Sequence, residues 1–148
     1  RPKVPNFTPE NQKFKIGQAI HLKEGTDVTI FSTGHLVWES LEAQKKLKEK
    51  GINAEIINIH TIKPLDTKTI INSAKKTGCV VTAEEHMMLG GLGESIAQLL
   101  GRKLPIPLEM VAVNDSYGES GPPMKLMEKY GLSEKDIVKS TKKVLNRK

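Results

Sequence analysis

The sequence predicts a three-layer α/β/α domain whose sheet has about five strands, mostly parallel, with one antiparallel strand at an edge. Short runs rich in Val and Ile, such as residues 28–33, alternate with longer segments of helical periodicity, such as residues 35–50. Strands separated by helices of this length are typical of parallel βαβ crossovers. Only a short turn follows the first β-type run, residues 16–22, which favours antiparallel pairing at the edge.

The chain opens with a segment that does not fit this alternation. Residues 1–13 hold three prolines and no hydrophobic periodicity, so we expect a linker or extended arm from a preceding domain. The first residue is Arg1 rather than Met, which favours a processed product or a piece of a longer chain. The domain itself is expected over residues 14–148.

The middle of the chain repeats a strand–helix cycle. Residues 35–50 are predicted to form a helix, because their apolar residues fall on one face at helical spacing. Gly51 occupies the C′ position that ends this helix. Residues 52–60 form the next predicted strand. Asp66 is positioned to cap the following helix, which Gly78 ends.

The last part adds two strands and three helices. A strand over residues 79–83 leads through a glycine-rich loop to a helix, and residues 108–113 form the last strand. The polar residues 114–121 are expected to be a loop before a short helix around residues 125–127. Ser133 to Asp136 resembles a capping box that opens the final helix.

Composition excludes several classes of protein. The net charge of +6 comes from lysines spread over helical faces, and aromatic residues make up only 4%, so we expect no nucleic-acid partner. No apolar run approaches the ~20 residues that span a bilayer, so we expect no membrane partner. The single cysteine, Cys79, excludes a disulfide within the chain, is expected to be buried, and fits a reducing, cytoplasmic setting.

The glycine cluster of residues 90–93 is the most informative local feature. It follows two carboxylates and a histidine at the end of a strand, where α/β folds build ligand sites. It is not a dinucleotide fingerprint, because Ile96 stands where the third glycine is needed, and no P-loop is present. Two interpretations stay open: an anion site at the helix N-terminus, or a turn that lets the helix pack closely on the sheet.

Loops that follow parallel strands meet at one edge of the sheet. We therefore expect a rim there that binds an anion or regulator, or that faces a partner subunit. Its candidate residues are Thr33, Gly34, His35, His60, Glu85, His86, Gly90, Gly91 and Gly93.

No set of residues predicts catalysis. Glu84, Glu85 and His86 are consecutive, so their side chains point in different directions and do not converge on one substrate atom. The four histidines lack metal-ligand spacing, and no nucleophile elbow is present. We therefore predict no catalytic, cofactor-binding or metal-binding residue.

A series of motifs, in order along nearly the whole chain, resembles the C-terminal domain of the transketolase family. The motifs are residues 24–30 (EGTDVTI), 33–35 (TGH), 59–66 (IHTIKPLD), 82–86 (TAEEH), 90–93 (GGLG), 115–121 (DSYGESG) and 130–132 (YGL). The segment 118–121 favours transketolase itself, and the compact spacing resembles the split, two-subunit enzymes. Ser116 and Tyr117 depart from the arginine and phenylalanine expected there, which leaves the subfamily open.

The resemblance implies a five-stranded mixed sheet and an assembly role without catalysis. In the family, thiamine diphosphate and Mg²⁺ (or Ca²⁺) bind in other domains, so we expect this fragment to bind no cofactor and to be inactive alone. The parent enzyme would transfer a two-carbon ketol unit between sugar phosphates, as in the pentose phosphate pathway. Its expected partners are the remaining transketolase domains or subunit and a second copy in a homodimer.

Other functions remain open at this point. The chain could be the C-terminal domain of a 1-deoxyxylulose-5-phosphate synthase or of a 2-oxoacid dehydrogenase beta subunit. It could also be a free-standing anion-binding module, or a docking module within a dehydrogenase complex.

Overall fold

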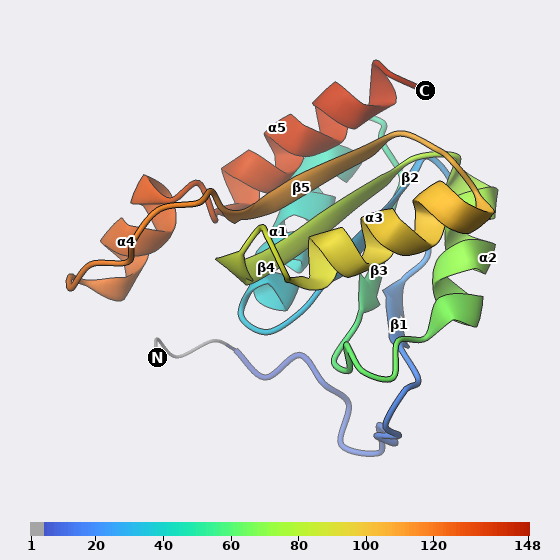
Figure 1. Cartoon of the computed structure of the whole chain (residues 1–148), viewed down its shortest axis with the longest axis horizontal. Helices are drawn as coiled ribbons and strands as arrows, with labels where there is room; N and C mark the ends of the chain where they lie inside the picture. Colours follow the sequence, from blue (N-terminus) through green and yellow to red (C-terminus); the bar gives the residue numbers. More distant parts are fainter. Residues whose placement is uncertain (1–4) are drawn as a thin grey trace.

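The central sheet has five strands in the order β1-β3-β2-β4-β5 (Figure 1). The computed structural model describes residues 5–148, so the first four residues of the predicted arm lie outside the description. The strands are β1 (Ile20–Lys23), β2 (Val28–Ser32), β3 (Ala54–Asn58), β4 (Val80–Met87) and β5 (Leu108–Val113), and the helices are α1 (Leu36–Lys48), α2 (Thr67–Thr77), α3 (Leu92–Lys103), α4 (Pro123–Lys129) and α5 (Glu134–Leu145).

The pairing of the strands confirms the predicted mixed sheet. Strand β2 pairs in parallel with β3 and β4, and β4 pairs in parallel with β5. Strand β1 pairs antiparallel with β3 at one edge. The long crossovers through helices require the parallel pairs, whereas the short turn between β1 and β2 permits the antiparallel one.

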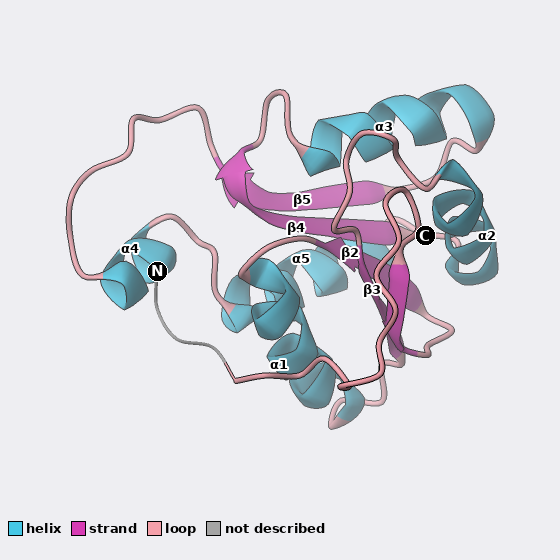
Figure 2. Ribbon diagram, turned by 90° about the horizontal axis from the view of Figure 1, so that it is seen from below, coloured by secondary structure: helices cyan, strands magenta, loops and turns pink. Residues whose placement is uncertain are grey.

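Helices cover both faces of the sheet and enclose two apolar clusters (Figure 2). Helices α1 and α5 pack together on one face, and α2 and α3 pack on the other. Ile30 and Ile56 belong to the cluster under α1 and α5, whereas Phe31 and Ile57 belong to the cluster on the opposite face. Neighbours in a strand alternate between faces, so each central strand supplies both clusters. Among the described residues, no helix is long and apolar enough to cross a bilayer.

Strand β1 is shorter than predicted, since it begins at Ile20 rather than at residue 16. Gly17 has a φ of 77°, which is incompatible with a strand, and its N–H donates to Thr61 Oγ1 at 3.2 Å. The Ala19 N–H donates to Asp66 Oδ2 at 2.9 Å. Asp66 Oδ1 also accepts the Thr69 N–H at 3.0 Å, so one carboxylate caps α2, as predicted, and fixes the entry into β1.

Strand β4 is longer than predicted, because it continues through Glu84, Glu85 and His86 to Met87. Its pairing with β5 is irregular between Ala83 and Met87 but resumes there. Since successive strand residues face opposite sides, Glu84 and Glu85 point to different faces of the sheet. The structure thus agrees with the expectation that these residues do not converge on one atom.

The turn between β1 and β2 lies directly against the start of β3. The Thr26 and Asp27 N–H groups both donate to Asn53 O at 3.0 Å, and the Asn53 N–H donates to Asp27 Oδ2 at 2.6 Å. A Cβ atom on Gly25 would lie 2.2 Å from the Glu55 nitrogen. Only glycine fits at this contact between two backbones.

Two sets of ion pairs and a capping box hold α5 in place. Lys46 on α1 binds Glu134 at 2.6 Å, and Glu109 on β5 accepts from Lys143 at 2.8 Å and from Arg147. The predicted capping box is confirmed, because Asp136 Oδ2 accepts the Ser133 N–H at 3.0 Å.

These ion pairs predict a loss of stability in acid. The hydrogen bond from Lys46 lowers the pKa of Glu134 below its ordinary value of 4.5. A carboxyl group with a lowered folded-state pKa stabilises the fold above its unfolded-state pKa and loses that contribution as the pH falls through the folded-state pKa. We therefore expect the free energy of unfolding, measured in urea, to fall below about pH 4.5, and Glu134→Gln to make that fall shallower.

Glu128→Gln is the matched control, because Glu128 is exposed and forms no ion pair with any described residue. It should leave the acid slope unchanged. Identical slopes for Glu134→Gln and the wild type would contradict the prediction.

Candidate functional site

The candidate rim lies where the chain leaves β2 and β4 in opposite directions. From β2 it crosses to β3 through α1, and from β4 it crosses to β5 through α3, although β2 and β4 are neighbours in the sheet. The carboxyl ends of two such strands form the crevice in which open α/β sheets bind ligands. Thr33 starts one loop, and its N–H donates to Ala83 O of β4 at 3.1 Å.

A cavity of about 380 Å³ opens at this crevice, and we call it the switch-point cavity. Three predicted rim residues, His35, Glu85 and His86, supply its polar end. Its other walls are apolar or aromatic and come largely from α4 and the residues beside it. They are Val113, Pro123, Leu126, Met127, Tyr130 and Leu132.

His35 is one of the two partly buried residues of these three. It is the N-cap residue of α1, its side chain is 9% exposed, and its Nε2 has no hydrogen-bond partner. The nearest carboxylate oxygen, Glu39 Oε1, lies 3.7 Å away. Burial raises the pKa of Glu39, although a hydrogen bond from the Glu134 N–H opposes the shift. No local pattern in the sequence indicated this buried pair beneath the rim.

The N-terminus of α3 already binds a carboxylate of the protein itself. Glu84 is 1% exposed, and its two oxygens accept the N–H groups of Leu92 and Gly93, each at 2.8 Å. These are the free N–H groups of a helix N-terminus that would otherwise attract an external anion. Anion binding by the rim as a whole stays a prediction. Two N–H groups that could have bound an anion, those of Leu92 and Gly93, already bind Glu84.

The glycines around this carboxylate provide close packing. A Cβ on Gly91 would lie 2.3 Å from Glu84 Oε2, and a Cβ on Gly93 would lie 2.8 Å from Thr82 Oγ1 and 2.9 Å from Met110 Sδ. The loop therefore lets α3 approach the sheet, which is the packing-turn interpretation.

The remaining rim residues lie around these two features. Gly34 has a φ of 60°, and a Cβ there would lie 3.6 Å from Glu85 Oε1. His60 lies beside Phe14, with 4.4 Å between ring centroids, and its Nδ1 contacts Thr61 Oγ1 at 2.8 Å. Gly90 and Gly91 line a shallow depression of about 330 Å³ beside His86. The rim is thus a row of small sites and not a single pocket.

The described residues at this edge do not fit the diphosphate group of thiamine diphosphate. Neither the switch-point cavity nor the depression beside Gly90 is lined by a lysine or arginine that the structure describes. The donors at the start of α3 are occupied by Glu84. A diphosphate placed here would meet the carboxylates of Glu84 or Glu85 without a compensating charge.

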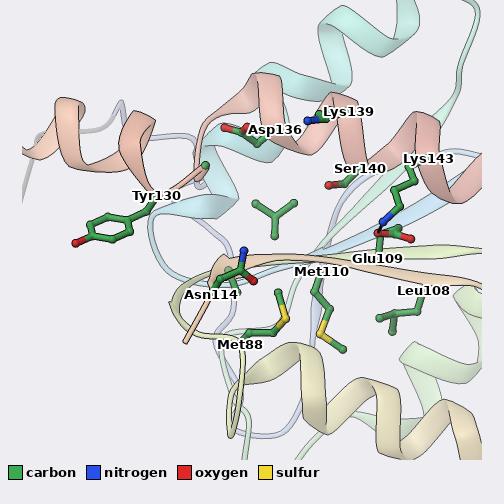
Figure 3. A pocket seen from close by; sticks show the side chains of 13 residues that line it. Met88, Leu108, Glu109, Met110, Asn114, Tyr130, Asp136, Lys139, Ser140 and Lys143 are labelled. Atoms are coloured by element: carbon green, nitrogen blue, oxygen red, sulfur yellow. Dashed lines mark hydrogen bonds and ion pairs between the residues drawn. The ribbon is translucent and has the colours of Figure 1, made fainter. Parts of the chain in front are cut away.

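Another cavity, of about 530 Å³, lies in a groove between β5 and α5 (Figure 3). Asp136, Lys139, Ser140 and Lys143 come from α5, and Lys143 reaches toward Glu109 on β5. Met88 and Met110 also line the cavity, but they lie on the other side of β5, toward α3. The ion pair between Glu109 and Lys143 crosses one end. None of the predicted rim residues lines this groove.

One group of side chains within residues 5–148 has metal-like spacing: His21, Glu24 and Glu55 have ligand atoms within 4.8 Å of one another. The ammonium group of Lys76 contacts Glu55 Oε1 at 2.7 Å and Glu24 Oε2 at 3.1 Å. A cation of the protein thus already pairs with both carboxylates.

Comparison with known proteins identifies the class. A family model for the C-terminal domain of transketolase matches residues 17–137. The chain belongs to the transketolase family and comprises this C-terminal domain. The mixed five-stranded fold described above is consistent with that membership.

Two of the similar proteins are subunits of transketolases. The 6-deoxy-6-sulfo-D-fructose transketolase subunit SqwH of a Clostridium species is 47% identical over 148 residues, which is all of this chain and 46% of that protein. One subunit of the apulose-4-phosphate transketolase of Phocaeicola vulgatus is 33% identical, over 95% of this chain and 45% of that protein. The chain therefore spans about half the length of these relatives.

A solved structure and a second enzyme type complete the comparison. A split-gene transketolase, described as an inactive beta4 tetramer, superposes with a TM-score of 0.94 at 43% identity, over 98% of this chain and 48% of that one. A 1-deoxy-D-xylulose-5-phosphate synthase of Geobacter sulfurreducens is 36% identical over 92% of this chain, but only 22% of the synthase is covered.

Proposed function

We propose that this chain is the C-terminal, non-catalytic assembly domain of a two-subunit transketolase. The observation that carries the proposal is the match of the entire chain to a transketolase subunit at 47% identity. The likeness to a split-gene transketolase at a TM-score of 0.94 supports it. The start of α3 also supports an assembly role, because its Leu92 and Gly93 N–H groups bind Glu84 of the domain itself and not an external ligand.

In this proposal the parent enzyme is cytoplasmic and transfers a two-carbon ketol unit between sugar phosphates. It uses thiamine diphosphate with Mg²⁺ or Ca²⁺, bound in domains other than this one. This chain contributes to subunit assembly, including a homodimer contact, and is inactive alone.

A second candidate is the C-terminal domain of a 1-deoxyxylulose-5-phosphate synthase. Identity of 36% to such an enzyme favours it. The departure at Ser116 and Tyr117 from the expected motif leaves the subfamily open. The two-subunit transketolase is preferred because SqwH matches at higher identity over the full length of this chain. The dehydrogenase beta subunit is a further alternative without a specific supporting observation.

Calorimetry and an activity assay test the proposal together. We expect titration of this chain with thiamine diphosphate and Mg²⁺ to give no binding at micromolar affinity, because the described edge lacks a diphosphate site. We expect the longer natural subunit, combined with its partner subunit, to transfer a ketol unit from a ketose phosphate to an aldose phosphate.

Two results would contradict this proposal. One is micromolar binding of thiamine diphosphate by this chain alone. The other is a complex that forms 1-deoxy-D-xylulose 5-phosphate and does not transfer ketol units, which would favour the synthase.

A further inference from the structure

The exposed hydrophobic side chains of the domain gather at one end of the sheet. Within residues 5–148, seven large hydrophobic residues are exposed, and all seven lie at or beyond the carboxyl ends of the strands or in the segment before β1. We call this segment, residues 5–19, the arm. They are Phe14, Ile16, Ile62, Met87, Leu89, Tyr117 and Met124. Grouped apolar exposure of this kind marks an interaction surface more often than scattered exposure does.

Five of these residues form a continuous surface, which we call the edge patch: Phe14, Ile16, Ile62, Met87 and Leu89. The last three surround the depression of about 330 Å³ at the end of β4. The arm joins them, because the Phe14 ring lies against His60 and the Gly17 N–H donates to Thr61, the neighbour of Ile62. Phe14 and Leu89 are 66% and 64% exposed, so most of each side chain is open to contact with another surface.

Three lysines are interleaved with the edge patch. Lys13 and Lys15 alternate with Phe14 and Ile16 on the arm, and Lys63 follows Ile62. All three are exposed, and none forms an ion pair with a residue that the structure describes. A surface that covered the patch would therefore need an apolar centre with carboxylates at its rim.

The arm indicates which surface this is. From Pro5 the arm runs beside α1 (Figure 2), where Phe7 stacks on Trp38 with 6.3 Å between ring centroids. It then reaches the edge patch at Phe14. The arm thus runs along the edge on which the patch lies. The chain spans only 46% and 45% of its two-subunit relatives, so a partner of comparable size within one subunit is consistent with their length.

We propose that the edge patch is the docking surface for the domain that precedes the arm in the longer subunit, and that this domain presents an apolar face rimmed by Asp or Glu. The inference rests on the proposed function, from which the longer subunit follows. The patch is then an internal surface of that subunit, exposed only when the domain is separated.

Hydrogen exchange of the longer natural subunit, compared with this chain, tests the proposal. We expect amides of residues 60–66 and 86–91 to exchange at least tenfold more slowly in the longer subunit. Amides of residues 24–27, at the opposite end of the sheet, should exchange equally in both. Equal exchange of residues 60–66 and 86–91 in the two proteins would overturn the proposal.

A variant pair separates docking from folding. Leu89→Asp should leave the unfolding temperature of this chain unchanged, because the side chain is exposed, but should restore fast exchange of residues 60–66 in the longer subunit. Met124→Asp is the matched control, since Met124 is 62% exposed on α4 outside the patch, and it should change neither property. If the two variants behave alike in the longer subunit, the patch is not the docking surface.

Two further readouts identify other occupants and separate this inference from the proposed function. If this chain sediments as a dimer that Leu89→Asp dissociates, a second copy occupies the patch and the proposal is overturned. If the longer subunit protects the patch but shows no ketol transfer with its partner, the docking stands and the proposed function fails. If ketol transfer occurs without protection of the patch, the proposed function stands and the docking fails.

Discussion

Replacing Gly25 with alanine should lower the free energy of unfolding by about 3 kcal/mol, the upper end of the usual cost of overpacking. The added Cβ would lie 2.2 Å from the Glu55 nitrogen and 2.3 Å from the Ala54 carbonyl carbon. These are backbone atoms of β3, a strand inside the sheet, so they cannot move aside as a flexible side chain would. Urea denaturation followed by circular dichroism measures the change.

Gly101→Ala is the matched control for this prediction. Gly101 lies within α3, and a Cβ there would meet no atom within 4 Å. Alanine should therefore stabilise the helix by about 0.5–1 kcal/mol, because it loses less backbone entropy than glycine on folding. If Gly25→Ala and Gly101→Ala change the free energy of unfolding equally, the turn between β1 and β2 does not approach β3 as closely as described.

Replacing Glu84 with alanine should cost about 3 kcal/mol, since two hydrogen bonds to a buried carboxylate are lost. The N–H groups of Leu92 and Gly93 would be left buried without a partner, and the positive end of the α3 dipole would lose its neighbouring charge. We expect the first turn of α3 to exchange its amide hydrogens faster, in addition to the loss of global stability in urea.

Glu94→Ala gives the comparison for Glu84→Ala. Glu94 is exposed and accepts the N–H of Gly90 outside the helix, so its loss should cost less than about 1 kcal/mol. Glu84→Gln keeps the size of the side chain and one acceptor oxygen, and should fall between the two. If Glu84→Ala is no more costly than Glu94→Ala, Glu84 does not stabilise the start of α3.

Local signals in the sequence predicted most of the architecture. The strand expected over residues 108–113 is β5 without a change of bounds, and Asp66 and Ser133 cap the helices that they were expected to cap. Hydrophobic periodicity and helix capping depend on residues within one or two helical turns, so both can be recognised in the sequence. The antiparallel edge strand was predictable because a short turn cannot make a parallel crossover.

The predicted bounds of β1 and β4 were wrong because they depend on contacts with residues far away in the sequence. Residues 16–19 alternate like a strand, but Thr61 and Asp66 bind their backbone and hold them in a turn. Strand β4 extends past its apolar run because Val113 pairs with Met87. Neither contact leaves a pattern in the local sequence.

The candidate site was predictable only in part. Topology brings the loops after β2 and β4 together, and three of the nine predicted rim residues, His35, Glu85 and His86, line one cavity there. The role of Glu84 was missed, although alternation along Val80, Thr82 and Glu84 places all three on the face of α3. The wall that α4 contributes to the switch-point cavity was not predictable, since no short-range pattern indicates where that helix packs.

The two hydrogen bonds of Asp66 join the arm to a helix. One oxygen holds the Ala19 N–H, just before β1, and the other holds the first turn of α2. A pull or rotation applied at the arm would therefore reach α2 directly, without first disturbing the sheet. The side chain acts as a mechanical coupling: the direction in which the chain enters the domain and the start of α2 are fixed by the same carboxylate.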